Sequence, residues 1–496
     1  MPIPQEILNV KRPVNTVVFS YGVHKDKYGV RKRVGCVRKD GKNKPINGPT
    51  VGHIINGVFV PNEVVVPRVN CSEVELKYWG NFVLCDYLMK DILEELKQIY
   101  NPQDAITIYC IMILRVCEPG IKDYELKEMY ECSFLSELYP GVGLSKNTVC
   151  EFWQDLGKAY SKITNFMRKR AETIKLDHHI LIDGTLKSNE SEVNTLSNFS
   201  RKAKTKGTRD ISVLYAFDLE IMEPICSQCF PGNMLDATSY EEFISNNHIN
   251  KGIIVADKGF PASGAKVHFD NNPELHYMNP LKRNSKYIEK YKLYEYEGLL
   301  QGYENISFKV VFCQEEKKWL YSFRDAWKAG KEERDYLSRA RKKGSYSDQE
   351  FRAKQREFGT LILECDYQMT AELAYKTYGS RWQIEIVMRF YKSACEFDET
   401  RVHNDYSVHA SEFCDFFSSL LTFRLLNFFD KKEISLDMTY KQTMKVLKRA
   451  QKVKDNGEWK LIKINPSQLE LLDRLELITP PAAPPKRKVG RPKKKI

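Results

Sequence analysis

The pattern of apolar and polar positions divides the chain into segments of different periodicity. Residues 15–66 are rich in Val and Thr and contain turn pairs such as Asn56-Gly57, which is typical of β-hairpins. Between residues 74 and 171, apolar side chains recur at helical spacing. This helical segment fits a helix-turn-helix DNA reader or a packing domain, and the pattern favours neither.

One helix in that segment has a clear start. Ser145 is a good N-cap, and the helix is expected to run to about Met167. Gly157 is its one interior weak point, because glycine costs about 1 kcal/mol relative to alanine inside a helix.

Short apolar runs after residue 179 predict a mixed sheet with helices. The predicted strands lie at residues 180–182, 212–216, 221–230 and 253–256, with a helix at 239–245. A charged, aromatic-rich stretch over about 284–356 interrupts this pattern of short apolar runs and indicates an inserted domain. The apolar pattern returns after it, with a predicted strand at 361–363 and a predicted helix from 371 to about 396.

The predicted fold class is therefore α/β, with a mixed-sheet core, an inserted domain, a helical N-terminal block and a basic β-rich N-terminal segment. At 496 residues, the chain is long enough for several domains. The predicted boundaries are 1–70 for the basic β-rich segment, 71–178 for the helical domain, 179–283 with 357–430 for the core, 284–356 for the insert, 431–478 for a C-terminal helical region and 479–496 for a basic tail.

The positive charge is concentrated at the two ends of the chain. Of the formal net charge of +12, residues 1–70 contribute +8 and residues 479–496 contribute +7, which leaves −3 for the remainder. Nucleic acid is the favoured partner, because each Lys or Arg set against a phosphate releases a condensed counterion. The alternative is that the charge serves solubility alone.

The basic tail also carries a motif. After a proline-rich linker at 480–485, Gly490-Arg491-Pro492 is flanked by basic residues and resembles an AT-hook, in which arginine lies in a narrow A·T minor groove. Only this core matches, since Val489 stands where an arginine is more usual. Arg491 is a candidate DNA-binding residue, with a disordered basic tail as the alternative.

The sequence gives no sign of a membrane or secreted protein. The most apolar stretch, residues 106–114, is nine residues long, whereas a membrane-spanning helix needs about 20. The first residues lack the apolar core of a secretory signal, so the thirteen cysteines are expected to be reduced. We expect a cytoplasmic protein.

Two aspartates follow predicted strands. Asp183 in LIDGT and Asp257 in VADKGF each come directly after an apolar run, with a glycine close behind. Side chains in this position lie at the rim of a sheet, and their oxygens suit hard divalent cations. For either aspartate alone, ordinary turn chemistry is the commoner explanation.

A third carboxylate lies on the predicted helix at 371–396. Tyr378, Arg381, Glu385 and Lys392 are separated by offsets of 3, 7 and 14, which at about 100° per residue place them within an arc of about 60°. Such a polar stripe would suit a metal ion and a phosphodiester together. The alternative is a solvated face of an amphipathic helix.

The spacing Tyr-(2)-Arg-(3)-Glu-(6)-Lys, preceded by D-G-T and D-K-G-F, resembles the Y-R-E-K signature of DDE insertion-sequence transposases, which have a ribonuclease H-like catalytic core. The motifs cover roughly residues 180–430, and all four signature positions match. The resemblance implies a ribonuclease H-like core in which Asp183, Asp257 and Glu385 are catalytic and bind metal.

The resemblance also implies partners and an activity. Tyr378, Arg381 and Lys392 would contact DNA, and the enzyme would bind the terminal inverted repeats of its insertion sequence, cleave the ends by metal-dependent hydrolysis and transfer the 3′-OH ends to target DNA. The expected partners are double-stranded DNA, at the ends and at the target, and a second copy in a homodimer on paired ends. Such a bacterial protein would associate with the nucleoid when bound to DNA.

The expected cofactor is Mg²⁺, as two ions, with Mn²⁺ as a substitute. Three carboxylates without a nearby His or Cys select hard ions over zinc, and two ions about 3.5–4 Å apart serve phosphodiester hydrolysis. Two alternatives stay open: a catalytically idle DNA-binding protein and a nuclease without strand transfer.

Two further residues are candidates for DNA binding. Lys258 follows Asp257 directly and would either touch DNA or balance the charge of the site. Trp319 follows two lysines in the insert, with Trp327 nearby, and an aromatic ring beside lysines can stack on an unpaired base. Core packing is the alternative for the tryptophans.

Other chemical motifs are weaker. Cys226 and Cys229 form a lone CxxC without the second pair that structural zinc needs. His178 and His179 lack a metal-binding helical motif, so a structural role is expected. Asp236 is a rival for a place in the triad but is better explained as a loop or helix-cap residue.

Overall fold

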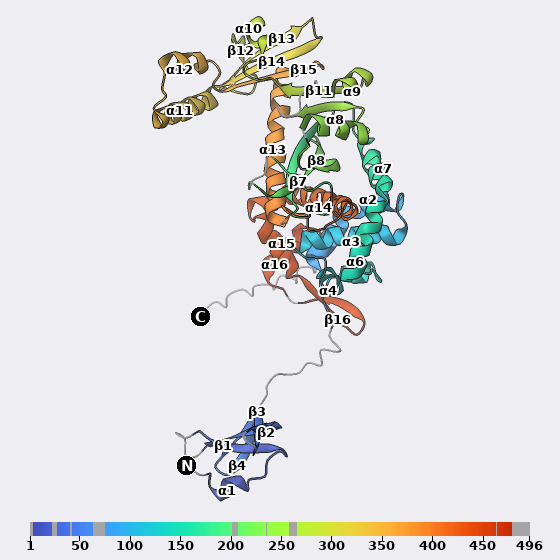
Figure 1. Cartoon of the computed structure of the whole chain (residues 1–496), viewed down its shortest axis with the longest axis vertical. Coiled ribbons are helices and arrows are strands. Elements are labelled where there is room, and N and C mark those ends of the chain that lie inside the picture. Colours follow the sequence, from blue (N-terminus) through green and yellow to red (C-terminus); the bar gives the residue numbers. More distant parts are fainter. Residues whose placement is uncertain are drawn as a thin grey trace, which may run out of the picture. The chain divides into compact units, whose positions relative to one another are not determined.

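The structure is a computed structural model that describes residues 3–21, 27–39, 42–62, 75–200, 207–234, 236–256, 265–395, 397–462 and 464–478. The chain divides into two compact units, Met1–Glu75 and Leu76–Ile496 (Figure 1). None of the helices in these described ranges is long and apolar enough to cross a membrane.

The first unit is an antiparallel sheet in which successive strands are neighbours. Its elements are α1 (Gln5–Leu8), β1 (Thr16–Ser20), β2 (Lys27–Lys39), β3 (Lys42–Ile55) and β4 (Val58–Pro61). Val18, Val30 and Ile54 form its small buried core. Between β3 and β4, Asn56 and Gly57 have φ of 48° and 77°, which confirms the predicted hairpin turn there.

The second unit begins with a short strand and a block of helices. These are β5 (Leu76–Tyr78), α2 (Gly80–Lys97), α3 (Pro102–Cys117), α4 (Leu126–Cys132), α5 (Leu135–Leu138), α6 (Lys146–Lys158) and α7 (Tyr160–Ala171). Ser145 caps α6 as predicted, because its hydroxyl accepts a hydrogen bond of 3.3 Å from the backbone N–H of Thr148.

The single helix expected from Ser145 to Met167 was wrong. The chain turns at Ala159, where ψ is 38°, and two helices result. The turn lets α6 pack against a long helix, α14 (Asp405–Lys431), while α7 packs against a strand, β9 (Glu223–Pro231).

Gly157 allows close contact between α6 and α14. A Cβ atom added there would lie 1.9 Å from the carbonyl oxygen of Tyr406. Gly157→Ala is therefore expected to lower the free energy of unfolding by about 1–3 kcal/mol, although alanine is the better helix former by about 1 kcal/mol. The measurement is the midpoint of unfolding in urea.

Gly330→Ala is the matched control for this substitution. Gly330 also lies inside a helix, α11 (Ala326–Lys343), but a Cβ atom added there meets nothing within 4 Å. Only the gain in helix propensity should operate, so the control is expected to be at least as stable as the wild type. A Gly157→Ala protein that gains stability like the control would contradict the close contact.

A mixed ten-stranded sheet forms the centre of the second unit. Its strands are β6 (His179–Ser188), β7 (Asn198–Phe199), β8 (Arg209–Asp218), β9, β10 (Gly252–Ala256), β11 (Leu275–Pro280), β12 (Gly298–Leu299), β13 (Ile306–Cys313), β14 (Lys318–Asp325) and β15 (Thr360–Cys365). The order is β12-β13-β14-β15-β11-β10-β6-β8-β7, and β9 pairs with β8. Only the β6–β10 and β10–β11 pairs are parallel among these strands. The predicted α/β fold class is confirmed.

Helices and a second small sheet complete the unit. The remaining elements are α8 (Asp236–Asn246), α9 (Lys266–Asn271), α10 (Lys286–Lys290), α12 (Asp348–Gln355), α13 (Ala371–Cys395), the 3₁₀ turn η2 (Ile434–Leu436), α15 (Tyr440–Lys448), β16 (Gln451–Asp455), β17 (Glu458–Leu461) and α16 (Pro466–Arg474). Strands β16 and β17 form a hairpin that pairs with β5, so the expected helical region at 431–478 also contains strands.

Strands from the segment expected as an insert join the central sheet. β14 pairs along its length with β15, and β13 and β12 extend the same edge. A small separate core of Ile288, Leu293, Cys313, Leu320 and Ile362 lies on this part of the sheet. Helices α11 and α12 lie between β14 and β15 in the chain (Figure 1).

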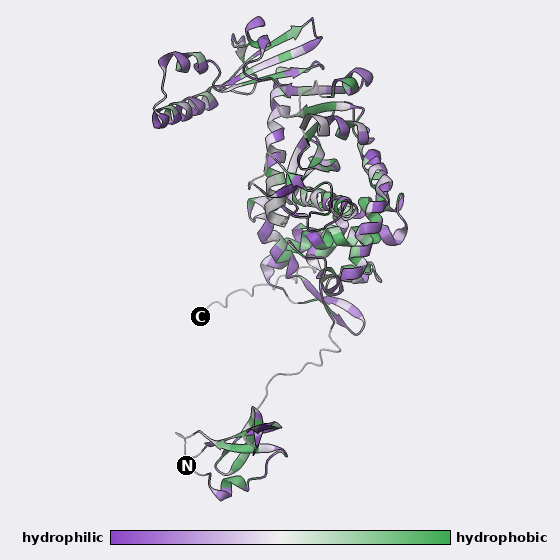
Figure 2. Cartoon of the chain, in the orientation of Figure 1, coloured by the Kyte–Doolittle hydropathy of each residue, from purple (hydrophilic) through white to green (hydrophobic). Residues whose placement is uncertain are grey.

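The main core lies between the helical block, α14 and the sheet. Figure 2 shows the most hydrophobic stretches in α2, α3 and the central strands, and α14 passes among them. Two phenylalanines of α14, Phe413 and Phe417, pack against Phe166 of α7 with ring centres 5.5 and 5.2 Å away. Helix α14 therefore joins the helical block to the sheet.

This core contains a buried network of charges. Nζ of Lys187, on β6, lies 2.6 Å from a carboxylate oxygen of Glu412 and 2.8 Å from one of Asp415, both on α14. Arg115 of α3 pairs with Asp415 at 2.6 Å. Burial alone would raise the pKa of Asp415, but Lys187 and Arg115 outweigh it, and the pKa is lowered.

Candidate active site

Asp183 follows the fully buried first part of β6. The strand is buried from His179 to Ile182, Asp183 is half-buried, and Gly184 is exposed. A carboxylate oxygen of Asp183 accepts a hydrogen bond of 3.0 Å from the backbone N–H of Gly184. The change from buried to accessible at this residue puts a carboxylate at the edge of the apolar core.

The neighbouring parallel strand ends at the same level. Ala256, the last residue of β10, is in register with Ile182, so the described pairing stops one residue before Asp183. Asp257 and Lys258 come next in the sequence and lie outside the described residues.

Helix α13 carries three predicted site residues along one side. The guanidinium of Arg381 forms an ion pair with Glu385, one turn further on, and lies 5.8 Å from the ring centre of Tyr378. Lys392 is also on α13, but its side chain is outside the described part. The structure thus brings Tyr378, Arg381 and Glu385 together as the helical spacing predicts.

This side of α13 faces the protein. Tyr378 packs against the main core, as do Ala374 and Met388 on the same side. The side chains of Arg381 and Glu385 keep 18% and 30% of their surface exposed. Glu385 is therefore held on an ordered helix but stays accessible to a ligand.

The chain that follows α13 is tied to the far end of β6. The backbone N–H of Ser188 donates to the carbonyl of Asp398 at 2.9 Å, and that of Thr400 donates to the carbonyl of Ser188 at 2.9 Å. Ser188 lies on the strand that carries Asp183. The segment that follows α13 is thus paired through its backbone with the strand of Asp183.

Comparison with known families identifies this part of the chain. Residues 175–410 match the family model described as the transposase DDE domain. This segment belongs to the transposase DDE family. The match contains Asp183, Asp257 and Glu385 and all four positions of the Tyr-Arg-Glu-Lys signature.

Two further comparisons complete the picture. No curated protein matches the chain in sequence. Among solved structures, the chain is similar to a piggyBac transposase in a synaptic complex with hairpin DNA, at 12% identity and a TM-score of 0.38, over 82% of this chain and 86% of that one.

The tryptophans of the transposase domain differ in exposure. Trp319, on β14, is half-buried against the main core, and its ring centre lies 4.8 Å from that of Phe312. Trp327, in the first turn of α11, is 76% exposed. The packing of Trp319 agrees with the structural alternative, and its role in DNA binding stays a prediction.

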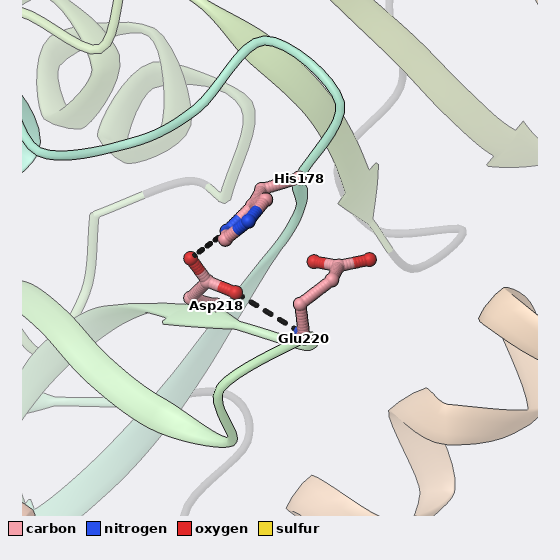
Figure 3. Close-up of side chains that lie close together, drawn as sticks. All are labelled: His178, Asp218 and Glu220. Atoms are coloured by element: carbon pink, nitrogen blue, oxygen red, sulfur yellow. Dashed lines mark hydrogen bonds and ion pairs between the residues drawn. The ribbon is translucent and has the colours of Figure 1, made fainter.

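A different group of ligand-type side chains lies at the start of β6 (Figure 3). Nδ1 of His178 lies 2.5 Å from a carboxylate oxygen of Asp218, whose other oxygen accepts a hydrogen bond of 3.0 Å from the backbone N–H of Glu220. One ligand atom from each of the three residues lies within 4.8 Å of the others. Sequence reasoning missed this group because Asp218 and Glu220 are some 40 residues from His178.

Protein hydrogen bonds account for this group without an ion. The carboxylate of Glu220 accepts a hydrogen bond of 2.8 Å from the backbone N–H of His179 and pairs with Nδ1 of the same residue at 2.7 Å. Burial alone would raise the pKa of Glu220, but the bonds to His179 outweigh it, and the pKa is lowered. Asp218 also caps the turn between β8 and β9. The group holds the start of β6 to that turn, which fits the structural role predicted for the two histidines, and it contains no member of the predicted triad.

The remaining candidates from the sequence are Cys226, Cys229, Asp236 and Arg491. Cys226 and Cys229 lie on β9, and burial raises the pKa of both thiols; among the described residues, neither belongs to a group that could hold a metal ion. Asp236 is the first residue of α8, and its side chain lies outside the description. Arg491 lies outside the described residues.

A cavity of about 550 Å³ lies elsewhere in the second unit. It is bounded by the loop after α3, the start of α6 and the chain from Phe397 to Asp415. Of the predicted site residues that the structure describes, none lines this cavity. Neither Asp183 nor Glu385 therefore borders it.

Proposed function

We propose that this protein is a DNA transposase that binds the ends of its insertion sequence, cleaves them by metal-dependent hydrolysis and joins the 3′-OH ends to target DNA. The observation that carries the proposal is the accessibility of two carboxylates inside the transposase DDE domain. Asp183 is half-buried on β6, and Glu385 is partly exposed on the side of α13 that packs against the protein.

Asp183, Asp257 and Glu385 fit a divalent metal ion. All three offer only carboxylate oxygen, which favours Mg²⁺ or Mn²⁺ over zinc. Because β6 and β10 are parallel and Ala256 is level with Ile182, the residues that follow these two positions in the sequence, Asp257 and Asp183, are proposed to share a site. When bound, two such ions supply an activated water and neutralise charge on the leaving oxygen.

The cations of the signature are proposed as DNA contacts. Arg381 is held beside Glu385 and Tyr378, so a phosphate that approaches Glu385 would meet a guanidinium already in position. Arginine binds phosphate through paired N–H groups. Lys392 and Lys258 are proposed as further DNA contacts.

The first unit offers a second surface for DNA. The outer parts of β2 and β3 form a two-stranded ribbon whose side chains are exposed. The ribbon carries Arg33, Arg38 and Lys42, and Arg31 and Lys32 precede it where β2 also pairs with β1. A two-stranded ribbon fits the major groove of B-DNA, so we propose that this unit contributes to end binding. A homodimer would supply one active site to each of two paired ends.

The test is cleavage of supercoiled plasmid that carries the inverted repeats flanking this gene. Mg²⁺-dependent nicking at the repeats, abolished by EDTA and absent from a plasmid without repeats, is expected. A second labelled duplex then detects joining. Nicking without joining would leave a nuclease, and binding without nicking would leave an idle DNA-binding protein.

The basic tail gives a separate prediction from sequence alone. Removal of residues 480–496 is expected to weaken general DNA affinity and to flatten its salt dependence, because several phosphate contacts are lost together, while cleavage persists. Affinities for A·T-rich and G·C-rich duplexes across a salt series provide the measurement.

The AT-hook interpretation makes a narrower claim about Arg491. Arg491→Ala should weaken binding to the A·T-rich duplex selectively, since arginine recognises a narrow minor groove. Equal losses on both duplexes would leave only electrostatic attraction. If truncation changes neither affinity, the tail has no part in DNA binding.

A further inference from the structure

We propose that the outer face of α11 binds the phosphate backbone of the target duplex, at a surface separate from the carboxylates; this rests on the proposed transposase function. We call this surface the basic face. It consists of Lys331, Arg334, Arg341 and Lys342, with Trp327 at its N-terminal end.

The helix separates these side chains from its packed side. Counted from Trp327, the four cations stand at offsets of 4, 7, 14 and 15, which fall within an arc of about 100°. All five side chains are exposed. On the opposite side, Ala329 and Ala340 are buried.

The packed side is anchored by aromatic contacts to the next helix. The ring of Tyr336 lies 6.0 Å from that of Phe351 on α12 and 5.7 Å from that of Phe358. These contacts fix which side of α11 faces outward. The basic face is therefore a consequence of packing and not of a freely rotating helix.

The cations of the basic face are not neutralised by the protein. Within the part of the chain that the structure describes, none of the four has a carboxylate within ion-pair distance. The acidic residues of α11 lie off this arc, and Glu332 is occupied by Arg283 at 2.9 Å. Four positive charges thus face outward on one stripe, which is the charge pattern that suits a row of phosphates.

Both ends of α11 are well capped. A carboxylate oxygen of Asp325 accepts hydrogen bonds from the backbone N–H groups of Trp327 and Lys328, at 2.9 and 3.0 Å, and Gly344 ends the helix with φ of 64°. From Trp327 to Lys342 the axis spans about 22 Å, enough to follow several phosphates. The caps hold the backbone positions of the four cations in a row along one helix.

Two observations favour target DNA as the occupant. The basic face, as defined, carries no Asn, Gln, Asp or Glu, the side chains that read adenine and cytosine edges, and phosphate contacts carry no sequence information. A target duplex of varied sequence needs such contacts, whereas an inverted repeat must be recognised. Trp327, 76% exposed beside the cations, adds a flat apolar surface that can pack on sugar or base. Figure 2 shows α11 as mostly hydrophilic.

The test compares two double substitutions on α11. Arg334→Gln with Lys342→Gln removes one Arg and one Lys from the basic face. Arg339→Gln with Lys343→Gln removes the same two residue types from exposed positions outside the arc. Both proteins are first checked for wild-type circular dichroism and unfolding midpoint.

Cleavage of labelled ends and joining to a random-sequence duplex are then measured separately. The basic-face variant should cleave ends like the wild type and join them about tenfold more slowly at 0.15 M salt. The slope of the joining rate against salt concentration, on logarithmic axes, should fall by the amount expected for the loss of about two phosphate contacts. The control should match the wild type in both steps.

The outcomes separate this inference from the proposed function. If the wild type neither cleaves nor joins, the proposed function fails. If the wild type does both and the basic-face variant joins as well as the control, the inference is overturned. An equal loss of cleavage and joining would assign the basic face to the transposon end and also overturn it.

Discussion

Glu385→Gln protein is expected to bind transposon ends with nearly wild-type affinity and to lose cleavage by about 10³-fold or more. Glutamine keeps the size of the side chain and an oxygen that can accept a hydrogen bond from Arg381, so the surface of α13 should persist. The negative charge that would hold the metal is removed, and metal catalysis contributes several kcal/mol, at about 1.4 kcal/mol per tenfold change in rate.

The same loss is expected for Asp183→Asn and for Asp257→Asn, because each removes one carboxylate of the same proposed site. Glu372→Gln is the matched control, since Glu372 lies in the first turn of the same helix and the substitution makes the same chemical change. Cleavage is measured on a labelled end duplex, and binding by gel retardation in Ca²⁺. Substantial cleavage by the Glu385→Gln protein would refute the assignment.

Lys187→Met is expected to destabilise the second unit by about 3–5 kcal/mol. Lys187 is 1% exposed, and its partners Glu412 and Asp415 are 2% and 5% exposed, so removal of the ammonium leaves Glu412 without its ammonium partner and Asp415 paired with Arg115. Breaking a buried ion pair by removing one partner has a cost of this size, even where the intact pair adds little.

Urea unfolding followed by tryptophan fluorescence measures the effect. Lys158→Met breaks an exposed pair with Asp155, whose side chains are 56% and 76% exposed, and should change stability by less than about 1 kcal/mol. Similar small effects for both substitutions would show that the Lys187 network does not support the fold. End cleavage by folded Lys187→Met protein at low temperature tests whether the loss is confined to stability.

Local pattern was sufficient for the elements that carry the proposed chemistry. The predicted strands at 180–182, 212–216 and 253–256 fall within β6, β8 and β10, because short apolar runs bounded by polar residues have few other ways to fold. The helix expected from 371 to about 396 is observed as Ala371–Cys395. Its 3.6-residue repeat alone places Tyr378, Arg381 and Glu385 side by side.

Contacts between distant residues were beyond local pattern. The expected helix from Ser145 to Met167 is divided in two at Ala159; both helices contact α14, and α7 also packs against β9. Glycine is required at position 157 because the backbone of Tyr406, far along the chain, leaves no room for a Cβ atom. Burial likewise distinguishes Trp319 from Trp327, although both stand among lysines in the sequence.

The sequence by itself therefore determined the strand that carries Asp183, the helix that carries Glu385 and the uneven distribution of charge, since these depend on residue type and spacing over a few turns. Only the tertiary structure decided the order of the strands, the burial of Lys187 with Glu412 and Asp415, and the outward direction of the basic face of α11. The physical reason is that strand pairing, desolvation of charge and helix orientation depend on which distant surfaces meet. Hydrophobic periodicity shows which face of an element is buried but not which other element packs against it.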